Sequence, residues 1–178
     1  MNNYGELIDN NTIKFSRLLP GPIERVWLYL TDSDKRETWL AAGKTEQAIG
    51  GVVELKFHNA SLSTSTDEPP AEKYRDMPEH VSFEGTVTQI DPPHLLSYNW
   101  PGETPEEESE VSFQLEQQGD KVLLTVIHRR IYKRSDLLGA TAGWHTHLDI
   151  LDDVLNNRPT KPFWTAHNAL EEEYEKRI

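Results

Sequence analysis

Histidines and carboxylates are the side chains with which this chain could do acid–base or metal chemistry, because it contains no cysteine. The densest group is His145, His147 and Asp149 in the segment GWHTHLDIL. On a helix, His145 and His147 point about 160° apart, so they cannot bind one metal ion from that helix alone. His145 shares a face with Asp149, a spacing typical of a solvated surface pair. We therefore predict no metal site and no cofactor.

Two histidines are candidates for contact with a ligand. His147 lies at the flank of an apolar helical stripe, where it is either a polar group in a pocket or a histidine satisfied at the helix edge. His128 is in phase with Leu124 and Val126 on a predicted strand, so it is either a ligand contact or a hydrogen-bonded residue at a strand end. His58 is expected to point outward. No local motif pairs a nucleophile with a base, so we predict no catalytic residue.

The composition is that of an acidic globular protein. The 178 residues carry 30 acidic and 18 basic side chains, which gives a formal net charge of −12. Binding to nucleic acid or to an anionic membrane needs a clustered basic face, and the basic residues at 129–134 are expected to be a solvated strand end. No stretch reaches the roughly 18 apolar residues that span a bilayer, and the N-terminus has no signal segment. We expect a cytoplasmic monomer or homodimer.

Alternation of apolar and polar residues predicts an antiparallel sheet. The predicted strands cover residues 12–19, 44–49, 52–58, 81–90, 94–101, 110–117 and 121–131, most of them joined by short turns. Residues 59–80 are too long and too polar for an ordinary hairpin loop, so we expect a lid or an insertion there. The five glutamates within 103–110 are expected to be a solvated hairpin tip.

Helical periodicity predicts four helices. Two short ones lie between the first and second strands, one beginning at Pro22 and one ending near Leu40. The longest is predicted over residues 137–155, and a last helix over 162–177. Gly139 and Gly143, four residues apart on the longest helix, are expected to let the sheet approach closely rather than to contact a ligand.

Six motifs in this order carry a family resemblance. They are Arg17, then PIERVW at 22–27 followed by Thr31-Asp32 and Trp39, IGGVVELKF at 49–57, GTVTQIDPPHLLSYNW at 85–100, SFQLEQQGDKVLLTVIH at 112–128, and GWHTHLDIL at 143–151. They resemble the START-like, Bet v allergen-like (SRPBCC) helix-grip superfamily. Within it, they resemble the group named after the C-terminal domain of the activator of the 90-kDa heat-shock chaperone's ATPase.

The resemblance implies an α+β helix-grip fold, in which a curved antiparallel sheet of about seven strands wraps around a long C-terminal helix. We expect one domain over residues 1–178, with its core at 12–156. The loop insertion at 59–80 and a C-terminal helical extension at 160–178 are departures from the family pattern.

The superfamily's construction also implies a cavity between the sheet and the long helix. Its expected lining combines apolar side chains with His128, His147 and Tyr98 as directional contacts. The apolar candidates are Trp39, Phe57, Phe83, Trp100, Phe113, Val126, Trp144, Leu148 and Leu151.

Three functions remain open on this basis. The first is binding of a small, largely apolar molecule, aromatic, polyketide-like or lipid-like, in that cavity. The second is partnership with a 90-kDa heat-shock chaperone, as in the namesake of the family. The third is a cofactor-independent cyclase or hydrolase that uses His128 or His147.

Overall fold

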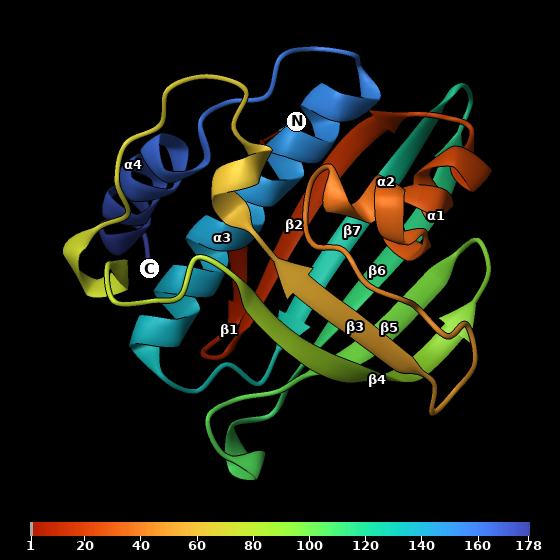
Figure 1. The fold of residues 1–178 in the computed structure, drawn as a ribbon. Coiled ribbons are helices and arrows are strands. Elements are labelled where there is room, and N and C mark those ends of the chain that lie inside the picture. The colour runs from red at the N-terminus through yellow and green to blue at the C-terminus, as the bar shows by residue number, and fades with distance from the viewer. Residues whose placement is uncertain (1) are drawn as a thin grey trace.

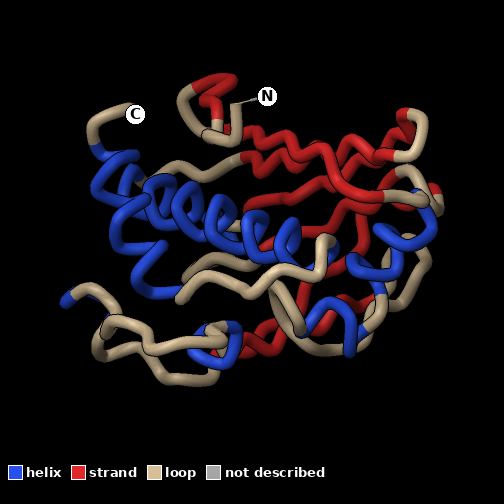
Figure 2. The backbone as a smooth tube through the Cα atoms, turned by 90° about the horizontal axis from the view of Figure 1, so that it is seen from above, coloured by secondary structure: helices blue, strands red, loops and turns tan. Residues whose placement is uncertain are grey.

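A curved seven-stranded sheet carries the helices on one face (Figure 1 and Figure 2). The computed structural model describes residues 2–178. The strands are β1 (Glu6–Asp9), β2 (Thr12–Pro20), β3 (Val52–Phe57), β4 (Val81–Asp91), β5 (Leu95–Trp100), β6 (Ser109–Gln118) and β7 (Lys121–Arg129). The helices are α1 (Ile23–Thr31), α2 (Ser33–Glu37), α3 (Arg134–Leu155) and α4 (Phe163–Glu175), with short 3₁₀ turns at Asn59–Leu62, Glu72–Tyr74 and Pro105–Glu107.

All neighbouring strands are antiparallel, in the order β1-β2-β7-β6-β5-β4-β3. The strands from β3 to β7 form the predicted meander, and β2 pairs with β7 at its far side. In that pairing Phe15 lies opposite Val126, and Ile13 lies opposite His128. All four side chains are buried, so the register turns one face of β2 and β7 toward α3. The predicted α+β helix-grip fold is confirmed.

The long helix α3 lies across the sheet and carries the predicted apolar stripe. Trp144, Leu148, Leu151 and Leu155 are all buried on it. None of the helices within residues 2–178 is long and apolar enough to cross a membrane.

The structure differs from the sequence prediction at two strands: one predicted strand is absent, and one observed strand was not predicted. Residues 44–49 form no strand, and only isolated bridges such as Thr45 with Val53 join this segment to β3. The reason lies in Arg36, whose buried guanidinium donates to the carbonyl oxygens of Ala41, Gly43 and Glu54 and to the Thr45 hydroxyl. These contacts hold the chain in an irregular path that a ladder would not allow. The strand β1 was not predicted, because all four of its residues are exposed and lack alternation.

The insertion at 59–80 and helix α4 lie side by side (Figure 1). The Thr160 hydroxyl donates to the Leu62 carbonyl oxygen at 2.8 Å, and the Phe163 amide donates to the Ser63 hydroxyl at 2.8 Å. The insertion and α4 therefore form one additional layer next to α3.

Candidate ligand-binding site

A cavity of about 860 Å³ lies between the sheet, α3, α4 and the 59–80 insertion. The strands β3, β4 and β5 contribute Phe57, Phe83 and Trp100 to its wall. These rings form a continuous aromatic surface, with centroid distances of 5.4 Å between Phe57 and Phe83 and 4.8 Å between Phe83 and Trp100. Trp144 on α3 extends it, at 5.6 Å from Trp100. One side of the cavity is therefore built to contact a flat apolar surface.

Six of the twelve predicted lining residues lie in the cavity wall. They are Phe57, Phe83, Trp100, His128, Trp144 and His147. The other six are elsewhere in the buried core, each at most 1 % exposed: Trp39, Tyr98, Phe113, Val126, Leu148 and Leu151.

The size of the side chains along α3 determines which part of the interior is open and which part is filled. In its second half, Leu148 and Leu151 fill the space against the sheet and leave no room for a ligand. In its first half, Gly139, Ala140 and Gly143 line the cavity. A Cβ atom added at Gly143 would have no neighbour within 4 Å. The expectation that the two glycines contact the sheet was therefore wrong, because their missing side chains open the cavity.

His128 is held in one tautomer by its neighbours. The Trp144 indole N–H, which can only donate, lies 3.0 Å from Nδ1, so Nδ1 accepts and Nε2 carries the hydrogen. Nε2 is 2.7 Å from the Ser109 hydroxyl, which lies 3.3 Å from the Trp100 carbonyl oxygen. Burial, with a smaller contribution from the Arg130 charge, lowers the pKa of His128 to about 3. Both ring nitrogens are thus engaged, and neither is available to take a proton from a ligand.

His147 has one ring nitrogen free. Its Nδ1 lies 2.7 Å from the Trp39 carbonyl oxygen, so Nδ1 carries the hydrogen and Nε2 is an acceptor. Burial lowers its pKa to about 4, although the bond to Trp39 acts in the opposite direction. The ring packs against Phe163 at 5.0 Å and Phe57 at 6.2 Å, between α4 and β3. Within residues 2–178, Nε2 has no hydrogen-bond partner.

Sequence reasoning missed the part of the wall that comes from the insertion and α4. Tyr74 from the insertion and Phe163, Trp164 and His167 from α4 all line the cavity. The last helix was predicted over residues 162–177, but nothing in its spacing indicated which surface it covers. The resemblance offered no guide either, because the lining that it implies lies on the sheet and on the long helix.

Asp67 connects the insertion to α4. Its carboxylate accepts from the backbone N–H groups of Trp164 and Thr165, both at 2.9 Å, and from the Ser63 hydroxyl at 3.0 Å. Burial alone would raise the pKa of Asp67, but these hydrogen bonds outweigh it and hold the pKa below its ordinary value. The negative charge also lies at the N-terminus of α4, where the helix dipole favours it. Asp67 therefore acts as a helix cap supplied from a distant part of the chain.

Replacing Asp67 with Ala is expected to lower the free energy of unfolding by about 1–2 kcal/mol at pH 7, the usual cost of losing a helix cap. Urea denaturation would measure it. Because the folded pKa is lowered, the contribution is present above the ordinary carboxyl pKa and is lost as the pH falls through the lowered value. Asp76→Ala is the control, since Asp76 is an exposed carboxylate of the same insertion. Equal losses in the two variants would contradict the capping role.

A second contact fastens the insertion to α4. Glu171 is buried on α4, where it forms an ion pair with Lys73 and accepts from the Tyr74 hydroxyl at 3.1 Å. Burial, and then the Glu171 charge, raise the pKa of Tyr74. The tyrosine therefore keeps its hydrogen and donates it, which fixes its ring against Trp164 and His167 in the cavity wall.

The charged residues in the cavity wall are mainly acidic. Besides the capping residue Asp67, the wall contains a set of carboxylates that we call the acidic rim: Glu68, Glu79, Glu103, Glu107 and Asp136. Lys133 is the basic side chain among them, and it is paired with Glu107 at 2.7 Å and with Glu103 at 3.4 Å. The predicted solvated hairpin tip thus contributes two rim carboxylates, and the rim as a whole disfavours an approaching anion.

His145 lies outside the cavity and is not solvated, contrary to the sequence prediction. It is 5 % exposed, and its Nδ1 lies 2.7 Å from the Tyr174 hydroxyl on α4. Burial lowers its pKa to about 4, although Asp149, 3.5 Å from Nε2, acts to raise it. Asp149 is itself paired with Arg17 at 3.0 Å. The histidine is buried because α4 and the N-terminal segment cover this face of α3, which the spacing on α3 could not indicate.

Comparison with known proteins agrees with this architecture. Residues 20–156, well over half of the chain, match the family described as "Activator of Hsp90 ATPase homolog 1-like protein". A protein of Bordetella parapertussis solved by solution NMR is 38% identical, with a TM-score of 0.80 over 99% of this chain and 91% of that one. A search of curated proteins finds no match.

Two more distant structures show the same fold. CalU16 from Micromonospora echinospora is 21% identical, with a TM-score of 0.66 over 93% of this chain and 86% of that one. The Aha1 dimer from Colwellia psychrerythraea is 19% identical, with a TM-score of 0.60 over 81% of this chain and 95% of that one. The chain is thus a member of the family of Activator of Hsp90 ATPase homolog 1-like proteins, with the helix-grip fold of the SRPBCC superfamily.

Proposed function

We propose that this protein binds a small, neutral or cationic aromatic molecule in the cavity between the sheet, α3, α4 and the insertion. Binding of hydrophobic ligands is known among proteins with this fold. The observation that carries the proposal is the cavity itself, because 860 Å³ is within the range of small-molecule sites, roughly 300–1,000 Å³.

The aromatic wall supports an aromatic ligand. Phe57, Phe83, Trp100 and Trp144 present rings from the sheet and from α3, and Trp164 adds another from α4. Ring stacking gives a flat aromatic molecule an advantage of about 0.5–1.5 kcal/mol per pair over an aliphatic one of equal area. A ligand with fused or linked rings would use several of these contacts at once.

Unpaired polar atoms in the wall support a ligand that carries hydrogen-bond donors. Within residues 2–178, Asn59 Oδ1 is buried without a hydrogen-bond partner, and Asn59 lines the cavity. Nε2 of His147 is a second acceptor. A buried acceptor without a partner costs free energy, which a ligand hydroxyl or amine would recover. Hydroxylated aromatic molecules, including polyketide-like ones, have this combination.

Titration with the neutral dye Nile red tests the proposal. We expect saturable binding at micromolar protein, competition by neutral hydroxylated aromatics, and much weaker binding of an anionic naphthalene sulfonate dye, because the acidic rim repels it. Absence of saturable, competable binding by any neutral aromatic would contradict the proposal.

The family supports a second candidate, partnership with a 90-kDa heat-shock chaperone, since the name of the family refers to the ATPase of that chaperone. We expect this protein to accelerate ATP hydrolysis by the chaperone from its own organism if it is such a partner. A pull-down together with an ATPase assay decides it, and a negative result in both would eliminate this candidate without affecting the ligand proposal.

A further inference from the structure

Two histidines face each other where the sheet ladder ends and the insertion begins. The last pair of the β3–β4 ladder is Phe57 opposite Val81. The next residue on each side is a histidine: His58 immediately precedes the insertion, and His80 is its last residue. In an antiparallel arrangement such residues are neighbours across the strands. The sheet register therefore brings together two imidazoles that are far apart in the sequence, with Glu79 beside them.

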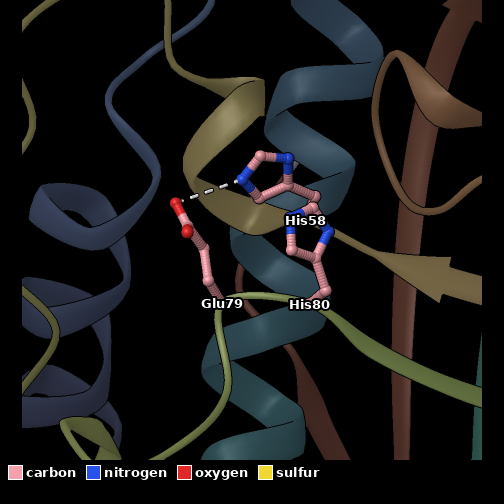
Figure 3. Close-up of side chains that lie close together, drawn as sticks. All are labelled: His58, Glu79 and His80. Carbon is pink, nitrogen blue, oxygen red and sulfur yellow. Dashed lines mark hydrogen bonds and ion pairs between the residues drawn. The ribbon is translucent and has the colours of Figure 1, made fainter.

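The three side chains converge (Figure 3). The two imidazole rings lie 4.1 Å apart between centroids, and the Glu79 carboxylate reaches back to His58, with 3.3 Å between Oε1 and Nε2. One ligand atom from each of the three residues lies within 4.8 Å of the others. We call these residues the His58–Glu79–His80 cluster.

This spacing suits a transition-metal ion. Ligands at about 2.0–2.1 Å in tetrahedral geometry lie roughly 3.3 Å from one another. The His58–Glu79 distance already has this value, and the cluster's side chains are partly or fully exposed, so small rotations can bring His80 into place. Two imidazoles and one carboxylate favour Zn²⁺ and its neighbours over Mg²⁺ or Ca²⁺, which prefer oxygen alone.

We propose that the His58–Glu79–His80 cluster is a binding site for Zn²⁺ that fastens the two ends of the 59–80 insertion together. The fourth coordination position is left for water. Glu79 also belongs to the cavity wall, so the ion would fix one part of the acidic rim. The proposal does not depend on the identity of the cavity ligand or on whether the cavity binds one.

Calorimetric titration of the tag-free protein with ZnCl₂ at about pH 7.5, where imidazoles are neutral, tests the site. We expect one ion per chain, with affinity lower by about tenfold or more after His58→Ala or His80→Ala. His94→Ala is the matched control, because His94 is another exposed histidine, in the turn between β4 and β5.

The variants are expected to keep the fold, because both substituted side chains are exposed or half-exposed, and circular dichroism checks it. Equal zinc affinity in His58→Ala, His80→Ala and His94→Ala would overturn the site.

Hydrogen exchange tests the fastening. Saturating Zn²⁺ is expected to slow amide exchange within residues 59–80 in the unmodified protein and to leave it unchanged in His58→Ala. Bound zinc with unchanged exchange throughout this segment would overturn the fastening role.

Discussion

Replacing Gly143 with Leu is expected to abolish binding of a neutral aromatic ligand while the protein stays folded. A Cβ atom at this position meets nothing within 4 Å, so the new side chain extends into the cavity rather than into the core. It then occupies volume that the ligand needs beside Trp144. We expect affinity for Nile red to fall by about a hundredfold or more, since each 1.4 kcal/mol of lost contact is roughly a factor of ten.

Stability separates this effect from damage to the fold. Glycine within a helix is less favourable than alanine by about 1 kcal/mol, and leucine is nearly as good a helix former as alanine. The melting temperature of Gly143→Leu is therefore expected to rise or stay level. Ala169→Leu is the control, because Ala169 is exposed on α4 and lies outside the cavity wall. Unchanged dye affinity in a folded Gly143→Leu variant would place the binding site elsewhere.

Acid is expected to destabilise the protein well above the range in which carboxylates titrate. Four buried histidines have lowered pKa values in the folded state, about 3 for His128 and about 4 for His145 and His147, and burial also lowers the pKa of His167. Below the ordinary histidine pKa of 6.5, the unfolded chain binds protons that the folded chain does not. The free energy of unfolding therefore falls as the pH drops from about 6.5 toward 4.

The expected loss is several kcal/mol, because each such histidine contributes up to about 2–3 kcal/mol over two pH units. Urea denaturation at a series of pH values measures it. His128→Gln should have a lower free energy of unfolding at neutral pH. On acidification it should lose less of that free energy than the unmodified protein, because unfolding then takes up about one proton fewer. His94→Gln, which replaces an exposed histidine, should follow the unmodified protein. A free energy of unfolding that is flat between pH 6.5 and about 4.5 would contradict the assignment of these histidines as buried and neutral.

The core of the fold follows directly from periodicity. Apolar and polar residues alternate in strands such as β2 and β7, and apolar residues form a stripe on α3, because one face of each element packs against the interior. Such patterns can be recognised within a short stretch of sequence. The predictions fail where the local pattern of apolar residues does not determine the path of the backbone. The Arg36 guanidinium holds the 41–45 segment by donating hydrogen bonds to carbonyl oxygens of that segment. The strand β1 is an exposed edge strand with no buried face.

The candidate site was predictable only in part, for a similar reason. Phase along a strand or helix indicates which side chains point inward, but it does not distinguish a filled interior from a cavity. Leu148 and Trp144 belong to the same stripe, yet only Trp144 borders the open space. The difference comes from small residues such as Gly143, and from an insertion whose position against α4 depends on Asp67 and Glu171.

The five tryptophans of the chain allow the most direct test of ligand binding in the cavity. Trp100, Trp144 and Trp164 line the cavity, whereas Trp27 and Trp39 do not. We would titrate ¹⁵N-labelled protein with 2-naphthol, a neutral hydroxylated aromatic, and follow the five indole N–H resonances. Saturable shifts of the three cavity resonances, with those of Trp27 and Trp39 unchanged, are the predicted result. Shifts confined to Trp27 and Trp39, or no saturable shift at any indole, would contradict binding in this cavity.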